Sequence, residues 1–204
     1  MMAPAALDSL FEAQQVWKGR AQRQRPDGQP TGHCALDACL PAGGWPGCAL
    51  SEILLAGEGV GELQVVWPAL ARLSQAGRRV VLVAPPHVPY APAWAAAGVA
   101  LDHLVVIQAG EADVLWAAEQ CLRSGSCAAV LCWPRRADDR SLRRLHVAAQ
   151  AGQALALAFR PLREAGNPSP AALRLVMEAA PARVRVLKCR GGMAPSTSIA
   201  LRQA

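Results

Sequence analysis

The sequence ILLAGEGVGEL, residues 53–63, is the first strong indication of the architecture. Its apolar run, residues 53–56, predicts a strand, and the glycines at 57, 59 and 61 predict a tight turn directly after it. From Leu63 apolar side chains recur at helical spacing as far as Gly77, and Pro68 either kinks this helix or marks its real start. A strand, a glycine-rich turn and a helix are the frame of a phosphate-binding loop.

The residues of this turn lack the chemistry of a phosphate-binding loop. Such a loop continues from its last glycine with a Lys, which neutralises phosphate charge, and a Ser or Thr, whose hydroxyl holds magnesium. Here Glu58 lies within the turn and Glu62 directly follows it, and each carboxylate would repel a bound polyanion by roughly 1–4 kcal/mol at surface-like dielectric. The only lysines of the chain, Lys18 and Lys188, lie far away in sequence. We therefore predict no nucleotide cofactor and no catalysis for this degenerate loop, which comprises Gly57, Gly59, Gly61, Glu62 and Leu63, with Glu58 between its glycines.

Short apolar runs and helical stretches alternate along the rest of the chain. Further strands are predicted at residues 79–84, 104–108, 128–133, 154–159 and 183–188, and helices at 92–97, 111–124 and 139–151. Apolar strands that alternate with helices are typical of a mostly parallel sheet with helices on both faces. The fold class is therefore α/β.

The composition indicates one soluble domain. The chain has 204 residues, of which 52% are hydrophobic and 18% charged, so it can build a core without disulfides or metals. No apolar run reaches the ~18 residues of a membrane span, and residues 1–25 contain no secretion signal. Seven cysteines without a CxxC pair favour reduced thiols over disulfides or zinc ligands. We expect a cytoplasmic protein that holds no metal and meets no membrane.

The basic residues are concentrated towards the end of the chain. Residues 1–134 carry 8 basic and 11 acidic groups, whereas residues 135–204 carry 13 basic and 4 acidic groups. Within the helix predicted at 139–151, Arg140, Arg143 and Arg144 share the side opposite the apolar residues. They form either a docking patch for an acidic protein or DNA, or a solvated face paired with Asp138 and Asp139.

The two ends of the chain are predicted to serve partners. Residues 1–30 form a short amphipathic helix, with Leu10, Phe11 and Trp17 on its apolar side, followed by a linker. A helix this short is unstable alone in water, so it docks on the body of the chain or on a neighbour. At the other end, residues 193–204 are expected to be a flexible tail that orders on binding.

The tryptophans are predicted to divide between core and interface. Trp67, Trp116 and Trp133 have core spacing, whereas Trp17 and Trp45 lie beside a linker or a turn and are expected at an interface.

Several segments, in the same order along the chain, resemble the core of RecA-type recombinases. They include T-G-x-x-x-L-D-x-x-L-x-x-G-G-W-P at residues 31–46, the turn at 97–99, residues 123–125 and the stretch 184–192. The resemblance implies a RecA-like core over residues 31–192. Pro86 stands where that family places a catalytic Glu, and Trp133 where it places a magnesium-associated Asp. Together with the degenerate loop, these departures imply a pseudo-ATPase.

Within that superfamily the chain looks like a member of the ImuA family, which is sometimes described as SulA-like. The resemblance rests on WKGR (17–20), GGWP (43–46), the loop at 56–63, APPHVPYAPAW (84–94) and VLKCRGG (186–192). It implies a non-catalytic adaptor of the mutagenic translesion complex in the SOS response. Its implied partners are the recombinase RecA, the polymerase-like ImuB and an error-prone polymerase, with indirect DNA contact. Lys188 and Arg190 stand where recombinases carry two basic residues that reach a neighbouring subunit's nucleotide; here they contact a partner or are plain surface charge.

Three alternatives to the adaptor stay open. The first is an SOS division inhibitor that blocks the polymerising cell-division GTPase. The second is a weak ATPase with an unusual loop, and the third is direct DNA binding, whose signature would be a steep salt dependence.

Overall fold

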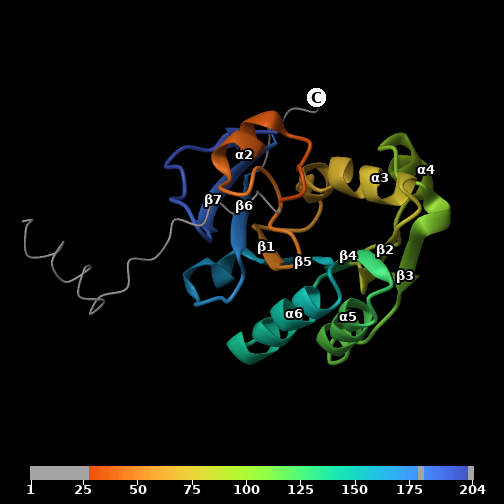
Figure 1. Cartoon of the computed structure of the whole chain (residues 1–204). Helices are drawn as coiled ribbons and strands as arrows, with labels where there is room; N and C mark the ends of the chain where they lie inside the picture. Colours follow the sequence, from red (N-terminus) through yellow and green to blue (C-terminus); the bar gives the residue numbers. More distant parts are fainter. Residues whose placement is uncertain (1–27, 179–181, 202–204) are drawn as a thin grey trace, which may run out of the picture.

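The computed structural model describes residues 28–178 and 182–201 of the chain. A single eight-stranded sheet runs through the described residues in the order β3-β2-β4-β5-β1-β6-β7-β8 (Figure 1). The strands are β1 (Leu50–Leu55), β2 (Arg79–Val83), β3 (Leu104–Ile107), β4 (Cys127–Cys132), β5 (Leu155–Pro161), β6 (Leu173–Glu178), β7 (Arg183–Cys189) and β8 (Ile199–Ala200). The helices are α2 (Cys34–Cys39), α3 (Trp67–Gln75), α4 (Ala91–Ala96), α5 (Val114–Arg123) and α6 (Asp139–Ala151). Three 3-10 turns complete the described part: η1 (Glu62–Val65), η2 (Leu101–His103) and η3 (Leu162–Gly166).

The parallel part of the sheet confirms the predicted α/β class. All pairs from β3 through to β6 are parallel, whereas β6–β7 and β7–β8 are antiparallel. The switch has a simple cause, because only residues 179–182 separate β6 from β7, and a parallel crossover needs a dozen residues or more.

Helices cover both faces of the sheet, which divides the core into two layers. α3 and α4 lie on one face, and α5 and α6 lie on the other (Figure 1). Alternate residues of each strand supply the two layers: in β4, Leu131 packs under α3, while Val130 packs under α5 and α6. In β5 the α3 side carries Leu157 and Phe159, and the α6 side carries alanines, which let the two long helices lie close to the sheet.

The helix predicted after the glycine turn is in fact two elements. η1 begins directly after Gly61, and the α-helix α3 begins at Trp67, with Pro68 in its first turn. Pro68 therefore marks the real start of the helix, because its missing N–H is not needed there.

Several elements were not predicted from the sequence. Among them are α2, the strand β6 and the strand β8, whose Ile199 pairs with Val184 and is buried. β8 lies within residues 193–204, which the sequence indicated as a flexible tail. The predicted N-terminal helix, with Leu10, Phe11 and Trp17, lies outside the described residues.

Two predictions about tryptophans are wrong. Trp45 was expected at an interface but is 0% exposed, because its side chain belongs to the core on the α3 side of the sheet. Its backbone pairs with Gln29 through hydrogen bonds of 2.9 and 2.7 Å. Trp116 was expected in the core but is 59% exposed.

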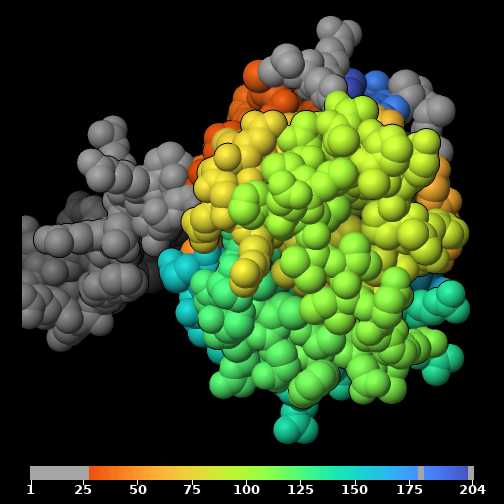
Figure 2. Space-filling view, turned by 90° about the vertical axis from the view of Figure 1, so that its right-hand side faces the viewer, coloured from red at the N-terminus to blue at the C-terminus, as the bar shows by residue number. Residues whose placement is uncertain are grey.

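One edge of the sheet presents apolar side chains to solvent. β3 is the terminal strand next to β2, and Val105 and Val106 are 39% and 40% exposed although they point to opposite faces. Figure 2 looks towards this side of the molecule, where residues from about 80 to 120 form most of the visible surface. Val88, Tyr90 and Leu101, which precede β3 in the sequence, are also exposed.

Candidate functional site

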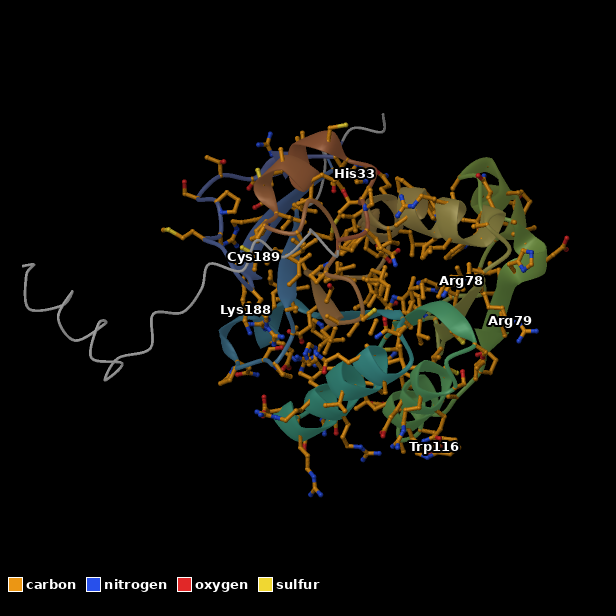
Figure 3. All side chains as sticks on the ribbon, viewed as in Figure 1. His33, Arg78, Arg79, Trp116, Lys188 and Cys189 are labelled. Carbon is orange, nitrogen blue, oxygen red and sulfur yellow. The ribbon has the colours of Figure 1, made fainter. Side chains whose placement is uncertain are left out.

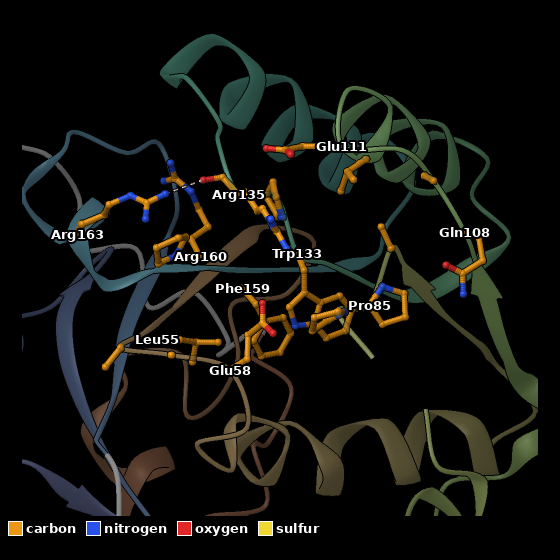
Figure 4. A pocket seen from close by; sticks show the side chains of 18 residues that line it. Leu55, Glu58, Pro85, Gln108, Glu111, Trp133, Arg135, Phe159, Arg160 and Arg163 are labelled. Carbon is orange, nitrogen blue, oxygen red and sulfur yellow. Dashed lines mark hydrogen bonds between the residues drawn. The ribbon is translucent and has the colours of Figure 1, made fainter. Parts of the chain in front are cut away.

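A cavity of about 470 Å³ lies where the parallel strands end. The residues that follow β1, β2, β4 and β5 all reach it, as do Gln108 and Glu111 from the connection between β3 and α5 (Figure 4). In open α/β sheets the carboxyl ends of the strands are the usual place for a ligand. The degenerate loop begins at this cavity, with Gly57 and Glu58 in its wall.

The loop presents carboxylates where a phosphate loop would present cations and N–H groups. Gly59 and Gly61 have φ values of 72° and 83°, a region that favours glycine, so the turn itself is glycine-dependent. Glu62 is buried, and its Oε2 has no hydrogen-bond partner among the described residues. The Oε2 atom of Glu58 lies 3.4 Å from Nε2 of His87. This arrangement opposes the binding of a polyanion.

The positions that would carry catalysis in a recombinase hold apolar groups. Pro86 lines the cavity, and Trp133 stacks on Phe159 with ring centroids 4.8 Å apart and planes inclined by 8°. Neither side chain has an acid–base group, whereas Glu58 and Glu111 contribute carboxylates to the cavity wall.

A buried charge cluster behind the cavity was missed in the sequence. Glu52 of β1 is 0% exposed and accepts hydrogen bonds from Arg160 Nη1 at 2.6 Å and Arg174 Nε at 2.7 Å. Arg160 also donates to Glu164 at 3.0 Å and to the carbonyl of Ala137 at 2.9 Å. The signal was a charged residue inside each of three apolar runs, because such residues are buried only when paired.

The arginines predicted as a patch lie together on the outer side of α6. Asp138 caps the helix by accepting from Ser141 N at 2.8 Å. Hydrogen bonding to the Ser141 side chain, followed by this bond to its backbone, holds the pKa of the Asp138 carboxyl below the usual value. Leu142 and Leu145 face the core, so Arg140, Arg143 and Arg144 point outward.

The three arginines differ in their surroundings. Arg143 pairs with the exposed Asp139 at 2.7 Å, four residues earlier on the helix. Arg144 pairs with Glu119 of α5, a carboxylate that is only 6% exposed and also contacts Arg123 at 3.4 Å. Arg144 is therefore part of the helix packing, whereas Arg140 and Arg143 are surface groups.

Trp116 adds an exposed aromatic side chain on α5, the helix with which Arg144 of α6 pairs. It lies three residues before Glu119 on α5, hence on the same side of that helix, and it points away from the body of the protein (Figure 3). Val147 of α6 is 57% exposed and lies one turn beyond Arg143 and Arg144. Sequence reasoning missed this surface, although Trp116 falls off the stripe of Val114, Ala118 and Leu122.

Lys188 and Arg190 lie elsewhere and are held by a loop. Lys188 Nζ donates to Ser169 O at 2.7 Å, and burial together with the neighbouring Arg190 lowers the pKa of Lys188. Arg190 lies 3.5 Å from His146, on the buried side of α6. Lys188 and Trp116 are well separated in Figure 3. The basic residues of the C-terminal third thus form at least two separate groups.

The structure shows neither a membrane-spanning helix nor a metal site in the part it describes. No helix within residues 28–178 and 182–201 is long and apolar enough to cross a membrane. Over the same ranges, no three His, Cys, Asp or Glu side chains are grouped so that they could hold a metal ion.

Comparison with known proteins identifies a family. The family model described as "Cell division inhibitor SulA" matches residues 48–156, which is more than half of the chain. The crystal structure of SulA from Pseudomonas aeruginosa matches with 29% sequence identity and a TM-score of 0.47, covering 54% of this chain and 97% of that chain. No curated protein matches. The finer resemblance to ImuA and to RecA-type recombinases stays a prediction, and the family model establishes that this chain belongs to the SulA family.

Proposed function

We propose that the protein is a non-catalytic inhibitor of cell division in the SOS response, which acts in the cytoplasm by binding the polymerising division GTPase. The observation that carries this proposal is the match of the SulA family model, described as a cell division inhibitor, over residues 48–156. The matched segment contains β1 to β4, the degenerate loop and the helices α5 and α6.

The site geometry supports binding rather than catalysis. Glu58 and Glu62 oppose a nucleotide, and Pro86 and Trp133 supply no acid or base. The outer sides of α5 and α6 combine an exposed Trp with exposed arginines, the residue types that dominate binding energy in protein interfaces. We assign the division partner to this surface, defined by Trp116, Arg140, Arg143 and Val147.

The test is a binding measurement against two partners side by side. The purified protein is titrated, at moderate salt, with the division GTPase and with the recombinase RecA, and GTPase polymerisation is followed by light scattering. Binding to the GTPase with loss of polymerisation is the expected result. Absence of binding to the GTPase would refute division inhibition.

A double charge reversal tests the surface. Arg140→Glu with Arg143→Glu should weaken binding about tenfold, with the difference shrinking at high salt. Arg144 is left intact because its reversal would place a second carboxylate against the buried Glu119. The control is Arg78→Glu with Arg79→Glu, the same change in charge at exposed residues at the start of β2 (Figure 3). Equal affinity of both double variants for the division GTPase would contradict the surface assignment.

A second candidate function is the adaptor of a mutagenic translesion complex, which binds RecA and the polymerase-like ImuB. It is favoured by the fold outside the matched segment: β6, β7 and β8 complete the sheet and, like the helix α2, lie outside residues 48–156. The strand order, with β1 between β5 and β6, is compatible with a RecA-like core that has lost its ATPase chemistry. Binding to RecA without binding to the GTPase would replace division inhibition by this function.

A further inference from the structure

The cavity at the carboxyl ends of the strands has a basic side. Arg135 and Arg163 both line it, and Arg163 Nη2 donates to the carbonyl of Arg135 at 3.4 Å, so the two residues lie next to each other (Figure 4). The Arg163 side chain is 67% exposed, and Arg135 is exposed as well. The third arginine of the wall, Arg160, already pairs with Glu52 and Glu164. Arg163 Nε also lies 3.6 Å from Glu164 Oε1, but its side chain stays largely exposed, so the guanidiniums of Arg135 and Arg163 remain accessible to a ligand.

Beside these arginines the cavity has an aromatic floor. Trp133 lies over Phe159, which is 2% exposed, so one ring is covered and the other remains half-buried at the cavity (Figure 4). The Trp133 Nε1 is buried, and no hydrogen-bond partner for it occurs within the described ranges. Such a floor favours an apolar ring, because stacked or edge-on aromatic contacts add to the gain from burial.

The rim excludes phosphate groups. Pro85, Pro86, Pro134 and Pro161 contribute to it, and proline has no backbone N–H to donate. Phosphate sites depend on clusters of such N–H groups. Glu58 and Glu111 also line the cavity and would repel a dianion more strongly than a single carboxylate.

We propose that this cavity binds an aromatic ring with a carboxylate beside it: the ring on Trp133 and the carboxylate between Arg135 and Arg163. A partner protein supplies this chemistry as an acidic residue next to a Phe or Tyr, and a small aromatic acid supplies it as a free molecule. The inference is independent of the proposed function, since the cavity and the outer side of α5 and α6 are different surfaces. It is tested on the isolated protein, so each can fail without the other.

The test uses the six tryptophan indole N–H signals of the ¹⁵N-labelled protein. Trp133→Phe identifies the Trp133 signal, and four probes are titrated to millimolar concentration. They are acetyl-Glu-Phe-amide, acetyl-Lys-Phe-amide, 3-phenylpropionate and thymidine monophosphate. We expect saturable shifts of the Trp133 signal with the acidic peptide or with 3-phenylpropionate, and none with the basic peptide. The tighter binder of the two identifies the source of the ligand.

Arginine variants test the proposed contacts. Arg135→Ala and Arg163→Ala should each weaken the acidic probe about three- to tenfold, as expected for a partly exposed charge-assisted hydrogen bond. Arg136→Ala is the control, because Arg136 is exposed next to Arg135 but does not line the cavity. Anisotropy of a fluorescein-labelled acidic peptide gives the same affinities without any tryptophan substitution.

Three results would overturn the proposal. They are an unmoved Trp133 signal with both acidic probes, equal binding of the basic peptide, and tighter binding of thymidine monophosphate than of either carboxylate. The last of these would reassign the cavity to nucleic acid.

Discussion

Glu52 is the residue on which most buried charge depends. It lies in the middle of β1, fully buried, between Arg160 of β5 and Arg174 of β6. Glu52→Gln removes the carboxylate that the two buried guanidiniums share and leaves Arg160 with Glu164 alone, so we expect the free energy of unfolding to fall by about 3–5 kcal/mol. Urea denaturation followed by circular dichroism measures this loss.

A matched variant separates this effect from the removal of any charge pair. Glu178 Oε1 lies 3.5 Å from Arg185 Nε, and the side chains of Glu178 and Arg185 are 35% and 45% exposed. Glu178→Gln should cost no more than about 1 kcal/mol. If both variants lose the same stability, the buried cluster has no special role.

His146 makes stability depend on pH. Its Nδ1 accepts from Leu50 N at 3.2 Å, and burial, followed by the charges of Arg190 and Lys188, lowers the pKa of its imidazole below 6.5. The unfolded chain therefore binds the proton more readily than the folded chain. The contribution is complete above the unfolded pKa of about 6.5 and is lost as the pH falls below it.

The pH effect is measured as urea midpoints between about pH 7.5 and pH 5. His146→Gln should flatten the decline of the midpoint on the acid side, while His103→Gln in the turn η2, as the control, should leave the decline largely unchanged. An identical slope in both variants would assign the pH dependence to other groups.

At the scale of elements, the edge strand β3 is a predicted site of aggregation. Exposed edge strands that lack charge or proline pair readily with other chains, and β3 has the sequence LVVI. Val106→Lys should preserve the fold and delay aggregation on heating, as followed by light scattering. Val147→Lys on α6 adds the same charge at an exposed helical position and should delay it much less.

Elements with a strong local signal were predicted well from the sequence. α6 occupies residues 139–151 as predicted, because Asp138 caps it and its apolar stripe has a clear helical period. β6 was missed because Arg174 and Glu178 interrupt its apolar pattern, and only the distant Glu52 makes Arg174 tolerable there. The backbone pairing of Trp45 with Gln29 also joins residues that are not neighbours in the sequence.

The sequence located the glycine turn of the candidate site, because the strand, the glycines and the carboxylates of this turn are neighbours along the chain. The cavity could not be predicted, since its wall combines residues that follow several different strands. The separation of Arg144 from Arg140 and Arg143 depends on Glu119 of another helix and was invisible in the α6 sequence alone.

At the scale of the whole molecule, the matched segment omits part of this chain's sheet. Residues 48–156 contain β1 but lack β6, most of β5 and both arginines that hold Glu52. A fragment of residues 48–156 should therefore be largely unfolded, whereas residues 28–201 should fold. Circular dichroism and dispersion of amide NMR signals distinguish the two, and a well-dispersed spectrum of the short fragment would contradict this view.

The central position of β1 also has a consequence during protein synthesis. Glu52 is made long before its partner Arg174, which lies 122 residues further along the chain. At about 5–20 residues per second, a ribosome takes roughly 6–24 s to cover that distance. For most of this time an apolar strand with a buried carboxylate has neither neighbour available, because Arg160 of β5 follows Glu52 by 108 residues. The nascent chain is thus a natural client for a holding chaperone until translation has passed β6.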